Sequence, residues 1–359
     1  ARKYVGPEFS LAAESEPPRD WGVQTGLFTP YAVWKPYTYA VIGAGPSRTR
    51  YGFRRFPWAS YQHLRFLWAP LATRFGVEYV GRWRATGGNR LTTILARASD
   101  LEATAFWGYG NHSGDDGRTR DHVVFERQLL LEPGLSIPLG GGLTTTVGAT
   151  LRYTDPDAEP RALAAGAGPG IDDAYVAGGV RAGAVLDRRD HAGYPRGGAW
   201  LGTDGGYFPL ATGGAEQFGR AGAEARGYLT LGSATLAGRV GGRRVWGGAF
   251  PLQYAAALGG LQDLRGYDFF RFTGDQAAYG GADLRLKLTR MEIVTRGDLG
   301  VFALADAGRV WMNGESLGSW HTAYGGGGFF STLDNNVTVV LTYAYGERGL
   351  LYLSLGFPF

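Results

Sequence analysis

The sequence predicts an all-β protein, a closed antiparallel β-barrel of sixteen strands that crosses a membrane. Apolar and polar residues alternate with a period of two along most of the chain, as in strands that have one apolar face. The alternating segments run for about 10–14 residues, which exceeds the usual soluble strand and suits a tilted membrane crossing. Tight turns also alternate with long loops, as in a barrel with short turns at one end.

The composition agrees with such a barrel and excludes several other classes. The chain has 359 residues, with 60 Gly but no Cys, so it has neither a disulfide scaffold nor thiolate chemistry. No run of about 18 apolar residues is present, and no transmembrane helix is predicted. The mean hydropathy is slightly negative, which a barrel accommodates because only every second residue faces lipid. A net charge of +4, spread along the chain, does not indicate a nucleic-acid partner.

The first 27 residues differ from the rest of the chain. They contain the polar, proline-rich run Glu14-Ser15-Glu16-Pro17-Pro18-Arg19-Asp20, which is typical of a linker or loop. The start, Ala1-Arg2-Lys3, lacks the apolar core of a signal peptide. We therefore expect residues 1–27 to be a linker or N-terminal segment of a mature or excised chain, and residues 28–359 to form the barrel.

The strand positions follow from the alternation. Between Arg74 and Arg84, for example, aromatic and aliphatic residues take one face, and Glu78 shares the other face with arginines. Sixteen is an even number, as a bacterial barrel requires. The expected strands cover residues 28–35, 38–54, 60–70, 74–86, 90–101, 120–133, 143–154, 173–188, 199–210, 217–231, 234–246, 279–290, 298–311, 321–332, 336–345 and 349–359.

A long irregular segment, residues 247–279, carries the run Leu264-Arg265-Gly266-Tyr267. Loops of this length are uncommon in compact domains and are usually functional or disordered. This one has too many apolar residues for disorder, among them Leu261, Phe269 and Phe272. We expect its tip to fold back into the barrel and dock there.

Two carboxylates are candidate partners for Arg265. Asp306 lies in the apolar run Leu304-Ala305-Asp306-Ala307-Gly308, and a buried carboxylate needs a cationic partner. The period of two points Asp306 into the lumen together with Leu304 and Gly308, and it points Asp283 inward on the neighbouring strand. The alternative is a solvated Arg265, with Asp306 paired to a strand neighbour such as Arg285.

These two runs resemble the signature of the BamA-type outer-membrane barrels, the bacterial surface antigen superfamily, which includes two-partner secretion transporters. In that family an arginine-glycine-aromatic tip on the sixth outer loop meets an aspartate in a Phe-x-Asp-x-Gly strand motif. Leu304 stands where the family prefers Phe. The resemblance implies a bacterial outer-membrane barrel that handles the insertion or secretion of polypeptides. We find no repeats in the sequence like the POTRA modules usual in the family.

The last alternating segment resembles the final strand of bacterial outer-membrane barrels. It ends on an aromatic residue, and Ser354 stands where the family pattern has Gly. The resemblance implies that Phe357 and Phe359 form a C-terminal signal for the outer-membrane assembly machinery. The residues expected on one face are Leu351, Leu353, Leu355, Phe357 and Phe359.

Two shorter runs resemble the same family. Asp187-Arg188-Arg189-Asp190, followed by Pro195-Arg196-Gly197-Gly198, resembles the turn between its eighth and ninth strands. Phe106-Trp107-Gly108-Tyr109-Gly110-Asn111 resembles an element of members whose barrel follows a phosphoesterase or a patatin-like lipase domain. The same run also fits an aromatic loop end at the membrane interface.

Catalytic and metal sites are not expected. His112 and Ser113 are adjacent, so on a strand they would point to opposite faces, and no Gly-x-Ser-x-Gly motif accompanies them. Asp115-Asp116 and Asp172-Asp173 lack the full spacing of a calcium loop. The glycine runs at 139–142 and 325–328 lack the strand–loop–helix context of a phosphate cradle. We therefore predict no enzyme activity, cofactor or metal.

Two functions from different classes remain. In a protein-handling barrel, a docked loop tip would block leakage, and movement of the tip or parting of the first and last strands would admit a client polypeptide. The alternative is a passive pore, or a membrane anchor for a separate upstream domain, and the extent of the reading frame upstream would discriminate between them. The expected partners are outer-membrane lipid and lipopolysaccharide, the assembly machinery during biogenesis, and a client or passenger polypeptide.

Overall fold

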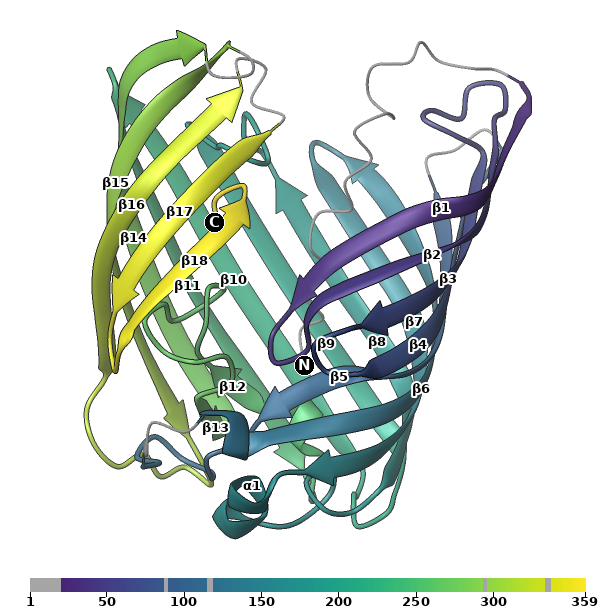
Figure 1. Ribbon diagram of the computed structural model, residues 1–359, viewed down its shortest axis with the longest axis vertical. Coiled ribbons are helices and arrows are strands. Elements are labelled where there is room, and N and C mark those ends of the chain that lie inside the picture. The colour runs from purple at the N-terminus through teal and green to yellow at the C-terminus, as the bar shows by residue number, and fades with distance from the viewer. Residues whose placement is uncertain (1–20, 87–89, 115–118, 293–295, 333–336) are drawn as a thin grey trace.

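Sixteen antiparallel strands form one continuous sheet in the computed structural model, which describes residues 21–86, 90–114, 119–292, 296–332 and 337–359 (Figure 1). This confirms the predicted all-β class and sixteen-stranded sheet. The strands are β1 (Val23–Lys35), β2 (Tyr39–Arg50), β3 (Ser60–Ala69), β4 (Arg74–Arg84), β5 (Leu91–Ala105), β6 (Val123–Gly140), β7 (Leu143–Ala158), β8 (Tyr175–Asp187), β9 (Gly198–Thr212), β10 (Phe218–Leu231), β11 (Ala234–Gly247), β14 (Gln276–Glu292), β15 (Arg296–Trp311), β16 (His321–Thr332), β17 (Thr338–Tyr345) and β18 (Gly349–Leu355).

Each strand pairs with its neighbour in the chain, except that β11 pairs with β14. The segment between these two strands holds the remaining strands, β12 (Ala256–Leu258) and β13 (Phe272–Gly274), which pair with each other. Among the described residues, short helices occur in three connections: η1 (Thr119–His122), α1 (Pro160–Ala165) and η2 (Leu252–Tyr254). Within the described ranges, no helix has the length and apolar character needed to span a membrane.

The connections separate the two ends of the sheet. The described residues 106–114 and 119–122 gather with residues 159–174, 248–275 and 312–320 at the end we call the loop end, at the bottom of Figure 1. The opposite end, the turn end, has tight connections such as residues 141–142 and 232–233. The predicted turns at 86–89 and 334–336 lie partly or wholly outside the described residues. β1 begins at Val23, inside the segment predicted to be a linker, so the sheet starts five residues earlier than expected.

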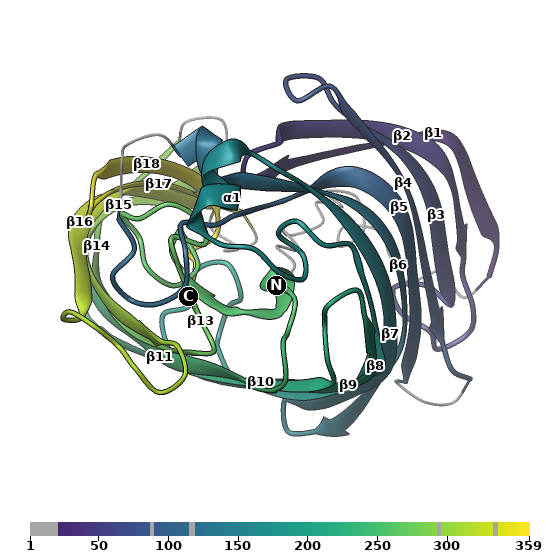
Figure 2. The same ribbon diagram turned by 90° about the horizontal axis from the view of Figure 1, so that it is seen from below.

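The strands keep their apolar side chains on the outside. Along β17, Val339, Leu341 and Tyr343 are exposed, and Val340 and Thr342 between them are buried. A soluble sheet would bury its apolar face, so this pattern identifies an outer surface that faces lipid. The inner face surrounds the segment between β11 and β14 (Figure 2), where β13 lies inside the curve of the sheet.

The predicted closure of the barrel is not found. No hydrogen-bonded ladder joins β1 to β18 in the described part of the chain, and Figure 1 shows these two edge strands on opposite sides of the opening. β1 has 13 residues and β18 has only 7, so their edges do not match in length. We call the gap between these two edges the seam.

The predicted orientation of the last residues is also wrong. Leu351, Leu353 and Leu355 share the outer face, but Phe357 and Phe359, expected on the same face, are only 8% and 0% exposed. Gly356 has a φ of +81°, which ends the strand and turns the chain inward. The N–H of Gly356 still donates to the carbonyl of Thr338 at 2.7 Å, but the N–H of Phe357 donates to the carbonyl of Gly193 at 3.1 Å, so the chain leaves the edge of the sheet after Gly356.

Candidate functional site

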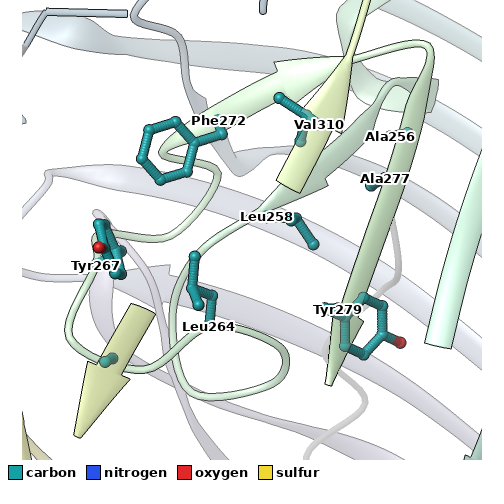
Figure 3. Close-up of a cluster of buried hydrophobic side chains, with 9 residues drawn as sticks. Ala256, Leu258, Leu264, Tyr267, Phe272, Ala277, Tyr279 and Val310 are labelled. Carbon is teal, nitrogen blue, oxygen red and sulfur yellow. The ribbon is translucent and has the colours of Figure 1, made fainter. Parts of the chain in front are cut away.

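The segment between β11 and β14 is packed into the lumen. Its apolar side chains form a core against the inner wall (Figure 3), and Tyr267 also donates from its hydroxyl to the carbonyl of Thr322 at 3.1 Å. Phe272 stacks on His321 with ring centroids 3.8 Å apart. The core consists of Ala256, Leu258, Leu264, Tyr267, Phe272, Ala277, Tyr279, Val310 and Ala323.

Arg265 at the tip of this segment meets both of the predicted carboxylates. Its Nε lies 2.6 Å from Asp306 Oδ2 and its Nη2 lies 2.8 Å from Asp306 Oδ1, which makes two parallel hydrogen bonds. The backbone N–H of Arg265 adds a third bond to Asp306 at 3.1 Å. On β14, Asp283 Oδ1 lies 2.9 Å from Arg265 Nη2. Arg265 and Asp283 are fully buried and Asp306 is 4% exposed, so solvent screens these charges only weakly.

The charge of Arg265 is stable in this setting. Burial alone lowers the pKa of Arg265, but the hydrogen bond to Asp306 and the charges of Asp283 and Asp306 outweigh it and raise the pKa above its usual range. The guanidinium is therefore a permanent cation and does not exchange protons. Its geometry suits a clamp that holds the tip and does not suit general acid–base chemistry.

Gly266 is required by both its conformation and its surroundings. Its φ of +82° lies in the left-handed region, and a Cβ at this position would stand 2.6 Å from the backbone nitrogen of Gly346. Its carbonyl accepts hydrogen bonds from the backbone N–H of Glu347 at 3.1 Å and of Arg348 at 3.4 Å. The tip is therefore pressed against the connection between β17 and β18.

The two other residues of the predicted strand motif line the dock. Leu304 is 5% exposed and packs in the cluster that holds Phe302 and Phe357. Gly308 leaves room for the loop, because a Cβ there would stand 2.9 Å from Leu258 and 3.4 Å from Leu264. The strand motif thus supplies a carboxylate, an apolar contact and a space for the loop.

Two further arginines join the site, and the sequence predicted neither role. Arg239 on β11 reaches Asp306 Oδ1 at 3.4 Å, and Arg285 on β14 donates to Asp283 Oδ2 at 3.0 Å. Arg285 therefore pairs with Asp283 and not with Asp306, which was the alternative left open. The strand phase places both arginines inward, but it does not say which of many inward arginines meet the tip.

Phe359 covers the same group of cations. The guanidinium of Arg239 lies 4.4 Å from the centre of its ring and that of Arg265 lies 5.2 Å away. Arg285 donates to the carbonyl oxygen of Phe359 at 2.6 Å. Phe357 packs against Tyr194, Phe302 and Phe329, with ring centroids 5.8, 5.4 and 5.2 Å away. The inward-turned end and the docked tip therefore share one buried cluster.

A second clamp holds the loop nearer the loop end. Arg271 donates to both carboxylate oxygens of Glu347, at 2.6 and 2.7 Å, and to the hydroxyl of Ser113 at 2.7 Å. Ser113 is thus an acceptor for an arginine, and the adjacent His112 shares no hydrogen bond with it in the described residues. No group of three or more His, Asp or Glu side chains that could hold a metal ion is found in those residues either. Asp115-Asp116 lies outside them.

The aromatic run 106–111 crosses the loop end and ties three connections together. Asn111 is 2% exposed, and its side-chain amide donates to the carbonyls of Leu317 and Ser319 at 3.1 and 2.9 Å. Its side-chain oxygen accepts from the backbone N–H of Val310 at 3.0 Å. The backbone N–H of Gly110 donates to Thr273 in β13 at 2.7 Å. This run therefore covers the docked loop at the loop end.

Comparisons with known proteins agree with this architecture. The family profile of the Omp85 superfamily domain matches residues 71–359. The solved structure of BamA from Haemophilus ducreyi lacking POTRA domains 1-3 matches with a TM-score of 0.63 and 12% identity, over 93% of this chain and 68% of that one. CdiB from Acinetobacter baumannii matches with a TM-score of 0.51 and 12% identity, over 94% of this chain and 66% of that one. No curated protein sequence matches. The resemblance drawn from the motifs is confirmed.

Proposed function

Because this chain belongs to the Omp85 superfamily, whose members are bacterial outer-membrane transporters, we propose that it inserts or secretes polypeptides through the seam between β1 and β18. The observation that carries the proposal is that the outer edges of β1 and β18 pair with no other described strand, although the rest of the sheet is continuous. An unpaired edge presents a row of free N–H and C=O groups, which is a template for another extended chain.

The docked loop supports this role in two ways. It packs against the inner face of β14 and β15 at the level of Arg265, so a polypeptide that enters at the seam meets a packed wall on that side of the lumen. It also fixes β15 and β14 through Asp306 and Asp283, on the side of the sheet that ends in β18. A rigid wall beside one edge allows the other edge to move while the dock stays in place.

The inward-turned end supports a seam that changes state. Phe357 and Phe359 reach the inner clusters because the chain leaves the sheet after Gly356. If these residues left the lumen and continued β18, that edge would lengthen toward β1. The closed barrel would then be one state of the protein and the open seam another. The two states would differ in whether Phe357 and Phe359 pack inside the lumen.

A passive pore is the competing function, and lumen packing weighs against it. Arg265 and Asp283 are completely buried and Asp306 nearly so, so the loop tip and the wall beside it are not lined by water as the side chains of an open pore would be. A passive pore would conduct ions steadily in a planar bilayer. The proposed transporter, with its loop docked, would conduct only in brief openings.

Engineered disulfides test the proposal directly, since the chain has no Cys of its own. Cysteine at Leu353 is combined in turn with cysteine at each residue of β1, and the pairs that cross-link are kept. The control pair is Tyr343→Cys with Leu351→Cys, which face each other in the β17–β18 ladder and leave the seam untouched. The readout is protease protection of an unfolded outer-membrane barrel protein added to vesicles that contain the purified transporter.

The seam proposal expects the cross-linked seam to stop insertion and a reductant to restore it, with no effect in the control pair. Undiminished insertion with a locked seam would exclude the seam as the route. Failure of the unlocked protein to accelerate insertion above empty vesicles would exclude the insertion activity itself, and a passenger secretion assay with the same locked pairs then decides the secretion alternative.

A further inference from the structure

Two arginines at the turn end of β2 point away from the lumen. In the ladder between β2 and β3, Ile42 faces Trp68, and both side chains are exposed on the outer surface. Arg48 and Arg50 lie an even number of residues further along β2, so they share that outer face. Both are exposed, and the ladder to β1 sets Arg50 opposite Val23, on the edge strand of the seam.

Exposed aromatic residues surround these arginines. Trp21, Phe53 and Phe56 are 84%, 67% and 55% exposed. The backbone N–H of Tyr51 donates to the carbonyl of Gly22 at 3.0 Å, which holds the start of β1 beside the connection after β2. Arg54 in that connection lies over the ring of Phe53 at 5.0 Å. We call Arg48, Arg50, Arg54, Trp21, Phe53 and Phe56 the seam-side patch.

The arginines of the seam-side patch have no carboxylate partner among the described residues. The other half of the turn end contrasts with this arrangement. There, Lys287 and Arg290 contact Asp298 at 2.6 and 3.0 Å, and Arg296 contacts Glu292 at 3.3 Å. The same end of the sheet therefore carries neutralised cations on β14 and β15 and uncompensated cations on β2.

We propose that the seam-side patch binds anionic phospholipid headgroups of the leaflet at the turn end. Arginines beside a lipid-facing surface extend their guanidinium groups to the headgroup level, where phosphate is the acceptor that the protein itself does not supply. Tryptophan and other aromatic rings occupy the same interface. The patch continues the apolar outer face of β2 and β3, so lipid and not a soluble acidic protein is what this surface meets.

The position of the patch gives the binding a consequence for the seam. Arg48 and Arg50 lie one strand from the free edge of β1, through the ladder positions Thr25 and Val23. Headgroups held there fix the depth of the β1 side in the membrane, and the β18 side has no such anchor in the described residues. This inference needs only that the barrel spans the membrane, and it stands apart from the polypeptide-handling proposal.

The test compares two double variants of the whole protein. Arg48→Gln with Arg50→Gln removes the outer cations of the patch, and Arg290→Gln with Arg296→Gln removes two exposed cations from the opposite half of the turn end. Each protein is incorporated into vesicles of phosphatidylcholine with a minor fraction of phosphatidylglycerol and then extracted. Native mass spectrometry counts the phosphatidylglycerol and phosphatidylcholine molecules that stay bound. Heat-dependent migration on gels checks that each barrel is folded.

We expect the preference for phosphatidylglycerol to fall about tenfold in the Arg48/Arg50 variant and to stay unchanged in the Arg290/Arg296 variant. Arg48→Lys with Arg50→Lys should retain the preference, because it keeps the charge. Equal preference in both glutamine variants would overturn the proposal. The proposal would also be overturned if an acidic protein cross-links at the patch and the Arg48/Arg50 variant keeps its preference for phosphatidylglycerol. If the double variant does not fold, Arg54→Gln in the exposed connection is measured instead, with loss of preference expected and an unchanged preference overturning the proposal.

Discussion

Arg265 and Asp306 are joined by two parallel hydrogen bonds of 2.6 and 2.8 Å, across 41 residues of sequence and from a loop to a strand. Both side chains are buried, and Arg239 and Asp283 extend the pair into a network of alternating charge. A network of this kind resists the removal of any single member, because each leaves another charge buried without its partner.

Replacing either member of the pair should release the loop tip. Arg265→Ala and Asp306→Ala each remove the clamp, at a local cost of about 3–5 kcal/mol, because each leaves a buried charge without its partner. We expect each single variant to increase ion leakage in planar bilayers. The double variant should leak no more than either single variant, since both lose one interaction. Additive leakage would show that the two residues act separately.

Gly266→Ala should undock the tip, and Gly314→Ala should not. The two glycines have nearly the same φ, +82° and +80°, so both substitutions carry the same backbone strain. Only at position 266 does the added Cβ meet the backbone of Gly346; at position 314 nothing lies within 4 Å. Limited proteolysis of residues 248–275 in membranes should therefore be faster in the Gly266 variant. Equal rates in the two variants would show that the close approach of Gly266 to Gly346 is not what holds the tip.

Phe357→Ala should destabilise the protein more than Leu353→Ala. Phe357 fills a cluster with Tyr194, Phe302 and Phe329, and its removal leaves a cavity that costs about 3 kcal/mol. Leu353 is 73% exposed on the outer face, where lipid replaces its contacts. Urea unfolding in detergent, followed by gel migration, measures the difference. A Leu353 variant as unstable as the Phe357 variant would place Phe357 on the outer face after all.

Removal of Phe359 should lower the level of the protein in the outer membrane. The motivation is its sequence resemblance to the final residue read by the assembly machinery, which the buried position of Phe359 leaves untested. Fractionation of cells that express the intact and shortened chains measures the level. Phe359→Leu keeps an apolar end residue and serves as the control. Equal levels of the shortened and intact proteins would remove Phe359 from that role.

Asn111→Ala should loosen the cover at the loop end. The substitution leaves the backbone N–H of Val310 and two carbonyls without their partners, at about 1–3 kcal/mol for a buried donor. Hydrogen exchange in residues 312–320 should rise, and exchange at the Arg265 tip should not. Ser319, an acceptor whose side chain is exposed, offers the control Ser319→Ala. Faster exchange at both places would show that the contacts of Asn111 at the loop end and the Arg265 clamp act as one unit.

The strand phase could be predicted from the sequence because a period of two survives errors in strand ends. Asp306 and Asp283 were assigned to the inner face on that basis, and the structure places both there. The same rule failed at Phe357 and Phe359, since Gly356 at a positive φ resets the alternation. The sequence also does not show whether the barrel closes. Closure depends on whether β1 pairs with β18, and two strands at opposite ends of the chain leave no local sequence pattern that reports their pairing.

The unequal edges of the seam set how strong it becomes when it closes. While Phe357 and Phe359 stay in the lumen, β18 keeps 7 residues against 13 in β1, so a ladder between them has at most seven residue pairs and leaves six residues of β1 unpaired. That ladder would have among the fewest residue pairs of any in the barrel wall. Lateral tension in the membrane would therefore separate it before long ladders such as β14–β15. The six unpaired residues of β1 can then form hydrogen bonds with an incoming strand even while the barrel is closed.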